Sequence, residues 1–367
     1  MGRREVLKEA TVPLTEVDVL ALSDKLGDPA WLRDKRLEAW RLAESLPMPG
    51  PSDEAWRRTD LRSLKWDEAM RFSDGNGAKL SDAPAELTTP LIGDKQGGLL
   101  VYVNGTLVKS ELNEELAKQG VIFSDLREAA EKHPDLVKKH FMTEAVQIGE
   151  DKIAALQAAL WTHGTFLYVP KNITVDLPLH SVEYTSATEM SATHVLVVLE
   201  EGASATYLHE SASPTLNVQV LHLTGTELLV RDNANLRYVA LQNWGEHLYN
   251  FGHQRARVGR AAQLDWIAGE MGTRLSKVFM TMDLDGDGAW GRMSGLFFTH
   301  NRQHLDLDTQ QNHHALSTTS DLLFKGALRG HSRTVGMQCH AGAGQWFSVL
   351  ATHLAFDARH ARECNRA

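Results

Sequence analysis

The acidic segment 283–288, with the sequence DLDGDG, is the first place where side chains could bind a cation. Alternating carboxylates ahead of a glycine begin the calcium-binding loop of an EF-hand. The twelfth position of such a loop supplies a bidentate glutamate, but here that position is Ser294. The flanking residues alternate between polar and apolar types, as strands do, whereas an EF-hand has helices on both sides. The segment is therefore interpreted as a turn between strands.

Two histidines, His300 and His304, have the spacing that places two imidazoles on one helix face as zinc ligands. Position 301 is Asn301, so the glutamate base of a metalloprotease is missing, and the segment has the pattern of strand and turn. Residues four apart also share one face of a strand, and His313 and His314 follow, so a metal site is conceivable. Surface or turn histidines are the simpler interpretation.

The remaining candidate metal ligands are Cys339 and His340, because thiolate and imidazole both bind iron and zinc. His353 and Cys364 follow them, but one adjacent pair is neither a C-x-x-C knuckle nor a matched set of four ligands. Incidental residues in a poorly structured tail are therefore the favoured interpretation. The sequence also has no phosphate-binding loop, no nucleophile elbow and no recognisable catalytic triad. These features favour a scaffold or assembly subunit over an enzyme.

Composition narrows the class of protein further. The 367 residues suffice for two or three domains, and 43% apolar with 23% charged residues is ordinary for a globular chain. The net charge of −9 argues against a nucleic-acid partner and against docking on an anionic membrane. Two cysteines give no disulfide framework, and no signal peptide or membrane span is recognised. We expect a cytoplasmic protein.

A repeat provides the elements that must position these residues. Segments that begin at Ala203, Ala234 and Ala262 share the order small, polar, apolar, polar, aromatic, aliphatic, and a weaker copy begins at Ala289. Each follows a cluster of Gly, Asn or Asp, residues that tolerate the positive φ of a turn. A period of about 30 residues with a turn before each strand predicts a parallel β-helix, a solenoid whose coils bury one another. A large antiparallel sandwich is the alternative.

Changes of pattern divide the chain into four predicted regions. Residues 1–98 form a helical region and linker, in which Asp28 is expected as an N-cap with Pro29 as the first helical residue. Residues 99–164 form a small α+β connection, with a hairpin at Asn104 and Gly105. Residues 165–335 form the β-helix core. Residues 336–367 form an atypical tail, helical or disordered, whose only sustained pattern is helical spacing over 346–356.

Several short sequence motifs occur along the chain in the same order as in one protein family. They are DPAW at 28–31, LPMP at 46–49, WRRTD at 56–60, YVPK at 168–171, LQNW at 241–244, the segment 284–295, HALSTTSD at 314–321 and LFKG at 323–326. Together they resemble the SufB/SufD family of the SUF iron–sulfur cluster assembly system, and within it the SufD subunit. The resemblance covers most of residues 28–335, which makes it far more specific than any single motif.

The resemblance implies a mixed α and β protein with a helical N-terminal domain, a right-handed parallel β-helix and a C-terminal helical segment. It also implies a non-catalytic scaffold that works beside SufB, its paralogue, and SufC, an ABC-type ATPase. No cofactor would be held stably by this chain, although a nascent cluster could form at a partner interface. SufB is the close alternative, but SufB-like chains carry a cysteine in the segment corresponding to 209–214, and this chain has none.

The resemblance ends near Val335. The family's β-helix continues, followed by a His-Gly-Ala-Thr segment at the SufB–SufD interface and by helices that dock SufC, and residues 336–367 match none of these. The segment 339–344 looks similar to the interface motif but comes too early and in a different order, so no role is transferred to it. We expect an out-of-frame or replaced tail on a truncated chain, with an open last coil prone to wrong pairing.

Two further hypotheses come from other classes of protein. A carbohydrate-active β-helix protein would need a secretion signal and repeated carboxylates on one strand face, and only Asp306 with Asp308 suggests such a row. A purely structural oligomeric scaffold would bind neither SufB nor SufC. Whether the chain forms a homodimer is left open by the sequence.

Overall fold

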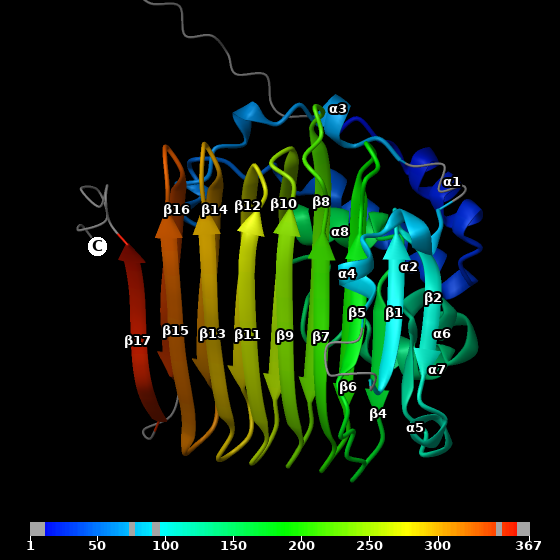
Figure 1. The fold of residues 1–367 in the computed structure, drawn as a ribbon, viewed down its shortest axis with the longest axis vertical. Helices are drawn as coiled ribbons and strands as arrows, with labels where there is room; N and C mark the ends of the chain where they lie inside the picture. Colours follow the sequence, from blue (N-terminus) through cyan, green and yellow to red (C-terminus); the bar gives the residue numbers. More distant parts are fainter. Residues whose placement is uncertain (1–11, 73–77, 90–95, 343–346, 358–367) are drawn as a thin grey trace, which may run out of the picture.

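The computed structural model of the chain describes residues 12–72, 78–89, 96–342 and 347–357. It contains two β-sheets that face each other, with most of the helices behind one of them (Figure 1). Sheet I has the strand order β2-β1-β5-β7-β9-β11-β13-β15-β17, and sheet II has the order β3-β4-β6-β8-β10-β12-β14-β16. The chain alternates between the sheets, and neighbouring strands are parallel except in the pairs β1–β2 and β3–β4. This is the predicted parallel β-solenoid, and it excludes the antiparallel sandwich.

The strands lengthen along the chain as the coils become regular. Sheet I contains β1 (Gly98–Val103), β2 (Thr106–Leu112), β5 (Leu179–Tyr184), β7 (Ser204–Ala212), β9 (Asn235–Trp244), β11 (Gln263–Gly272), β13 (Trp290–Thr299), β15 (Thr318–Leu328) and β17 (Phe347–Asp357). Sheet II contains β3 (Ile122–Asp125), β4 (Thr165–Val169), β6 (Ser191–Leu199), β8 (Val220–Val230), β10 (Leu248–Val258), β12 (Leu275–Leu284), β14 (His304–His313) and β16 (Arg333–Gly342).

The repeated sequence copies become β7, β9, β11 and β13, each beginning one residue after the alanine that opens its copy. Their aromatic positions fall into register, so Tyr207, Tyr238 and Trp266 form a buried ladder inside the solenoid. Ring centroids in this ladder lie 5.6 and 5.8 Å apart. Asn233, in the turn before β9, has a positive φ of 57°, as its residue type predicts. The sequence period therefore reflects one inward position repeated per coil.

The expected helical N-terminal region is confirmed, and most of it covers the outer face of sheet II (Figure 1). The segment with Ala83 and Leu87 packs instead against β1 and β5 of sheet I. Trp40, Trp56 and Trp161 pack with Phe251 of β10 into one apolar cluster between helices and sheet. The α-helices are α1 (Glu16–Leu26), α2 (Ala30–Ser45), α3 (Trp66–Ala69), α4 (Ala85–Thr88), α5 (Glu114–Lys118), α6 (Leu126–Lys132), α7 (Pro134–His140) and α8 (Lys152–Leu160), and the 3₁₀ turns are η1 (Glu54–Trp56), η2 (Leu61–Ser63) and η3 (Leu80–Asp82).

The predicted cap of α2 is wrong by one residue. Pro29 occupies the N-cap position, and the Asp28 carboxylate instead accepts a hydrogen bond of 2.6 Å from Arg36, with both side chains buried. The Arg36 guanidinium also donates to the carbonyl oxygens of Ala159 and Trp161 at the end of α8. A buried guanidinium needs a counter-charge and several acceptors, so Asp28 is held by the core and not by the helix end.

The hairpin predicted in the connecting region is confirmed. Asn104 and Gly105 have positive φ angles of 49° and 77° in the β1–β2 hairpin. Asp151 caps α8 by accepting a hydrogen bond of 2.8 Å from the Ala154 N–H. The boundaries of the four regions stay a prediction. Among the residues described, no helix is both long enough and apolar enough to cross a membrane.

The expected end of the strands near Val335 and the helix expected over 346–356 are wrong. Strand β16 pairs with β14 and β17 pairs with β15, both in parallel, so residues 333–342 and 347–357 continue the solenoid. A parallel ladder is made by backbone N–H and C=O groups, so a segment with an ambiguous side-chain pattern can still extend it. The preceding coil acts as the template for the new strand. A short segment with helical periodicity forms only a marginally stable helix by itself, so pairing with this template prevails.

Candidate functional site: a polar seam inside the solenoid

The acidic segment 283–288 contains the last two residues of β12 and most of the turn that leads to β13, so the predicted turn is confirmed. Each of its carboxylates has a partner within the protein. Asp283 accepts a hydrogen bond of 2.7 Å from Asn312, Asp285 bonds Arg257, and Asp287 accepts one of 3.0 Å from the Leu316 N–H. Within the described residues, no group of three or more His, Cys, Asp or Glu side chains is arranged to hold a metal ion.

The histidines considered as zinc ligands have different neighbours in the structure. His300 lies 3.4 Å from Glu246 on a turn, whereas His304 begins β14, where burial lowers its pKa to about 4. His313 contacts Thr318 and Ser320. The simpler interpretation of turn and surface histidines therefore accounts for His300, while His304 and His313 are partly or fully enclosed by the solenoid.

Cys339 and His340 lie side by side on β16, in register with Gln310 and Gln311 of β14. His353 lies on β17, next to Leu323 of β15 in the ladder, and Cys364 falls outside the described residues. The structure thus places the two candidate ligands on a strand of the solenoid. Their role in metal binding stays a prediction.

A row of polar residues points into the solenoid where sheets I and II face each other; we call it the interior seam. On sheet I, one residue of each successive strand occupies the same register position, and on sheet II a second row does the same. The seam comprises Glu183, Ser211, Gln242 and Glu270 from sheet I and Ser191, His222, Asn250 and Ser276 from sheet II, all buried. In the next coil the same positions are Phe297 and Leu305, so the polar row stops there.

Hydrogen bonds across the interior join the two rows. Asn250 Nδ2 donates to Gln242 Oε1 at 3.0 Å and to Ser276 Oγ at 3.3 Å. In an earlier coil, Ser191 Oγ donates to Glu183 Oε1 at 3.1 Å, and His163 Nε2 lies 3.3 Å from the same oxygen. The seam is therefore a partly bonded network, and it fixes the relative register of the two sheets.

The two carboxyl groups of the seam have opposite electrostatic environments. Burial alone would raise the pKa of Glu183, but His222 and His163 more than offset it and hold that pKa at about 2. Glu270 has no such neighbour, and burial raises its pKa to about 8. At neutral pH the seam thus carries a carboxylate at one end and a protonated carboxyl group at the other.

Four polar atoms of the seam have no hydrogen-bond partner in the protein: Gln242 Nε2, Asn250 Oδ1, Glu270 Oε2 and His222 Nδ1. His222 Nδ1 lies 3.9 Å from Glu183 Oε1, which is too far for a hydrogen bond. Buried polar atoms in folded proteins are nearly always bonded to protein, ordered water or a ligand. The free donors and acceptors along one line could therefore bind water or a small polar species inside the solenoid.

Comparison with known proteins identifies the family. A model described as "SUF system FeS cluster assembly, SufBD core domain" matches residues 182–337, and one described as "SufBD protein N-terminal region" matches residues 25–180. The chain belongs to the SufBD family. Iron–sulfur cluster assembly SufBD family proteins of Staphylococcus aureus (strain MRSA252) and Staphylococcus haemolyticus (strain JCSC1435) are each 28% identical to it over 336 residues, or 88% of this chain and 70% of theirs.

Both matched SufBD regions contribute to the structure around the site. The interior seam lies within the SufBD core match, and the helices α2 and α8 lie within the N-terminal match. The function of the family is iron–sulfur cluster assembly, which confirms the resemblance at the level of the family. The family match also decides against a carbohydrate-active protein. The core match ends at residue 337, close to the position where the sequence resemblance fades.

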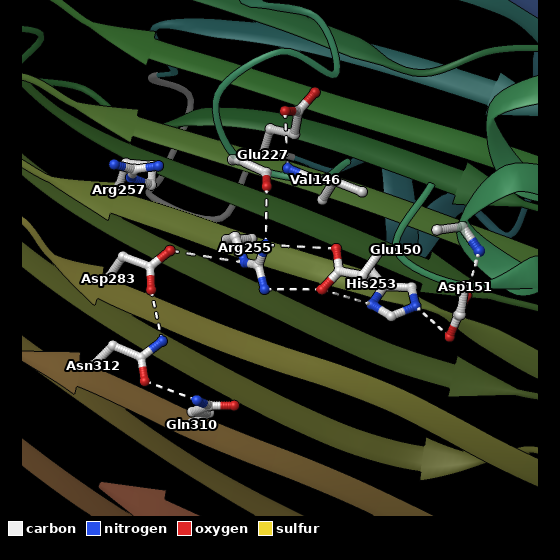
Figure 2. Close-up of polar contacts among 12 residues, drawn as sticks. Val146, Glu150, Asp151, Glu227, His253, Arg255, Arg257, Asp283, Gln310 and Asn312 are labelled. Carbon is white, nitrogen blue, oxygen red and sulfur yellow. Dashed lines mark hydrogen bonds and ion pairs between the residues drawn. The ribbon is translucent and has the colours of Figure 1, made fainter. Parts of the chain in front are cut away.

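The segment 142–151, which leads into α8, is attached to sheet II by a set of ion pairs and hydrogen bonds, which we call the belt (Figure 2). Arg255 of β10 bonds Glu150 at 2.8 Å, and His253 of the same strand lies 3.0 Å from Asp151, the cap of α8. Deeper in the belt, the fully buried Glu227 accepts hydrogen bonds from the backbone N–H groups of Met142 and Val146, at 2.7 and 3.2 Å. The belt holds the segment before α8 against sheet II.

Sequence reasoning missed the interior seam, although the chain carries a signal for it. In the copy that becomes β9, Leu236 and Tyr238 point into the solenoid. Every second residue of a strand shares this direction, so Gln242, four residues after Tyr238, also points inward. The same count from Leu264 and Trp266 leads to Glu270 on β11. Polar residues at inward positions of successive copies are the pattern that would have predicted the seam.

Proposed function

We propose that this chain is a scaffold subunit of an iron–sulfur cluster assembly complex in the cytoplasm, without catalytic activity of its own. Its partners would be a SufB-like paralogue and a SufC-like ABC ATPase, and the cluster would be cargo built at a partner interface. The observation that carries the proposal is the match of both SufBD regions over residues 25–337. The segment 209–214 contains no cysteine, which favours a SufD-like over a SufB-like subunit.

Co-purification tests the proposed complex. We expect the full chain, co-expressed with tagged SufB-like and SufC-like proteins of the same organism, to elute together with both from a sizing column. The ratio of the three chains should be constant across the elution peak. The tagged partners without this chain serve as the control for the position of the smaller assembly. Elution of the chain apart from both partners, as a well-folded species, would contradict the proposal.

The role of Cys339 is a separate expectation. After anaerobic incubation of the purified complex with iron and sulfide, Cys339→Ser is expected to lower the bound iron and acid-labile sulfide several-fold, because thiolate is the preferred ligand of iron–sulfur clusters. Cys364→Ser is the matched control and should leave both contents unchanged. Equal cluster content in the wild type and in Cys339→Ser would remove Cys339 from the candidate ligands without affecting the proposed complex.

A further inference from the structure

Three polar atoms of the interior seam that lack a hydrogen-bond partner lie close together. They are Gln242 Nε2, Asn250 Oδ1 and Glu270 Oε2, and the three residues are 9%, 2% and 4% exposed. Gln242 and Glu270 are register partners on the adjacent strands β9 and β11, and both point into the solenoid. Asn250 of β10 reaches the same place from sheet II, because its Nδ2 donates to Gln242 Oε1 at 3.0 Å. One small volume therefore holds three unsatisfied groups.

The hydrogen bonds that Asn250 does make fix the direction of its free oxygen. Its Nδ2 donates to Gln242 Oε1 and also to Ser276 Oγ, at 3.3 Å, so the amide is held from two sides. The first of these bonds also holds the amide of Gln242. Buried polar atoms are nearly always bonded to protein, ordered water or a ligand. Since the protein supplies no partner here, a bound molecule has to supply it.

The three atoms match the hydrogen-bonding capacity of one water molecule. Gln242 Nε2 can only donate, and Asn250 Oδ1 can only accept. Burial raises the pKa of Glu270 to about 8, so at neutral pH its carboxyl group is protonated and offers an O–H donor. A molecule that accepts two hydrogen bonds and donates one satisfies all three atoms. Water does this, and buried waters typically make about three hydrogen bonds.

We propose that one water molecule is bound inside the solenoid between Gln242, Asn250 and Glu270, as part of the native structure; we call this place the water site. A cation fits less well, because it would face the N–H donor of Gln242 Nε2. An anion would face the oxygen of Asn250. The water joins β9, β10 and β11, so it links the two sheets and also one coil to the next.

Small side chains beside the water site leave room for it. Ala240 and Ala268 occupy the next inward positions of β9 and β11, and Gly252 occupies the next one of β10. Trp244 of β9 and Phe297 of β13 border the site on other sides, and they are 3% and 1% exposed. The site is thus enclosed by the protein, and a water held there exchanges slowly with the solvent.

Oxygen-17 magnetic relaxation dispersion of the purified full chain tests the water site, because it counts water molecules that stay inside a protein for longer than the protein takes to tumble. The test variant combines Gln242→Met, Asn250→Leu and Glu270→Met, which replace the three polar groups by apolar ones of similar size. We expect this triple variant to lose one long-lived water relative to the wild type. The fold is expected to persist, since groups that bond one another are removed together.

Gln311→Met is the matched control. Gln311 is another fully buried glutamine that points inward, on β14, and its Nε2 donates to the carbonyl oxygen of Asp321 at 3.2 Å. This variant should keep the number of long-lived waters of the wild type. A high-resolution crystal structure of the wild type is a second measurement that needs no variant. It should show one ordered water at about 2.7 to 3.2 Å from each of the three atoms.

An empty water site in that crystal structure would overturn the proposal, whether or not the triple variant folds. Equal numbers of long-lived waters in the wild type and the triple variant, or an equal loss in Gln311→Met, would overturn it too. Thermal unfolding of the wild type in sodium, potassium and tetramethylammonium chloride at one ionic strength should give equal midpoints. A midpoint raised by one cation, and not in the triple variant, would assign the site to that ion instead. The water does not depend on the proposed function, so co-purification with Suf proteins can fail separately.

Discussion

Glu227→Ala is expected to lower the free energy of unfolding by about 3 to 5 kcal/mol, the range for removing one partner of a buried charged network. The Glu227 side chain is fully buried, and its carboxylate accepts hydrogen bonds from the N–H groups of Met142 and Val146. It also lies 3.0 Å from His194 Nε2. An alanine would leave two buried N–H groups and one imidazole nitrogen without this acceptor, and each such loss is costly.

Denaturant unfolding followed by tryptophan fluorescence measures this effect, because Trp40 and Trp161 lie in the cluster between the helices and sheet II. Hydrogen exchange should show faster exchange in residues 142–160 than in the strands of sheet I, since the belt is loosened locally. Glu150→Ala is the matched control, because it removes another glutamate of the belt that is partly exposed. Its partner Arg255 would keep its hydrogen bond to the carbonyl oxygen of Ala145. We expect a loss of at most about 1 kcal/mol there. Similar losses in both variants would contradict the assigned role of Glu227.

The solenoid could be predicted because one inward position repeats once per coil. The aromatic residue of each copy, Tyr207, Tyr238 and Trp266, marks the phase of its strand, and the turns before the strands carry residues suited to positive φ. Both signals are local and periodic. The helix over 346–356 was predicted wrongly because the competing interaction, pairing of β17 with β15, is not local and leaves no periodic trace in the segment itself.

The interior seam could not be predicted as a site, because its two halves come from different sheets. Gln242 and Asn250 are eight residues apart, and only the turn between β9 and β10 brings their side chains within 3.0 Å. The sequence shows Gln242 as one polar residue among several in an alternating strand. Asp28 illustrates the same limit, since its partner Arg36 is fixed by carbonyl groups of α8, more than a hundred residues away.

The seam also predicts how stability depends on pH. In the unfolded chain the carboxyl group of Glu270 has its ordinary pKa near 4.5, and burial raises it to about 8 in the folded protein. The folded state therefore binds one more proton between these two values. The stability that this proton provides is fully present below pH 4.5 and decreases as the pH rises from 4.5 to 8. Above pH 8 the free energy of unfolding is lower by about 4 to 5 kcal/mol than below pH 4.5.

Glu270→Gln removes the titration and keeps the size of the side chain. We expect the variant to be more stable than the wild type by about 3 kcal/mol at pH 7, with a gain that grows from pH 5 to pH 8 and shrinks towards zero at pH 4.5. The measurement is denaturant unfolding of both proteins across this range, with Glu115→Gln on the exposed helix α5 as the control. A gain that does not change with pH would show that Glu270 is ionised in the folded protein. A buried, ionised Glu270 would then require a cation or a hydrogen-bond donor beside its Oε2 to offset the free-energy cost of burying the charge. Oε2 is an atom of the seam for which the protein itself provides no hydrogen-bond partner.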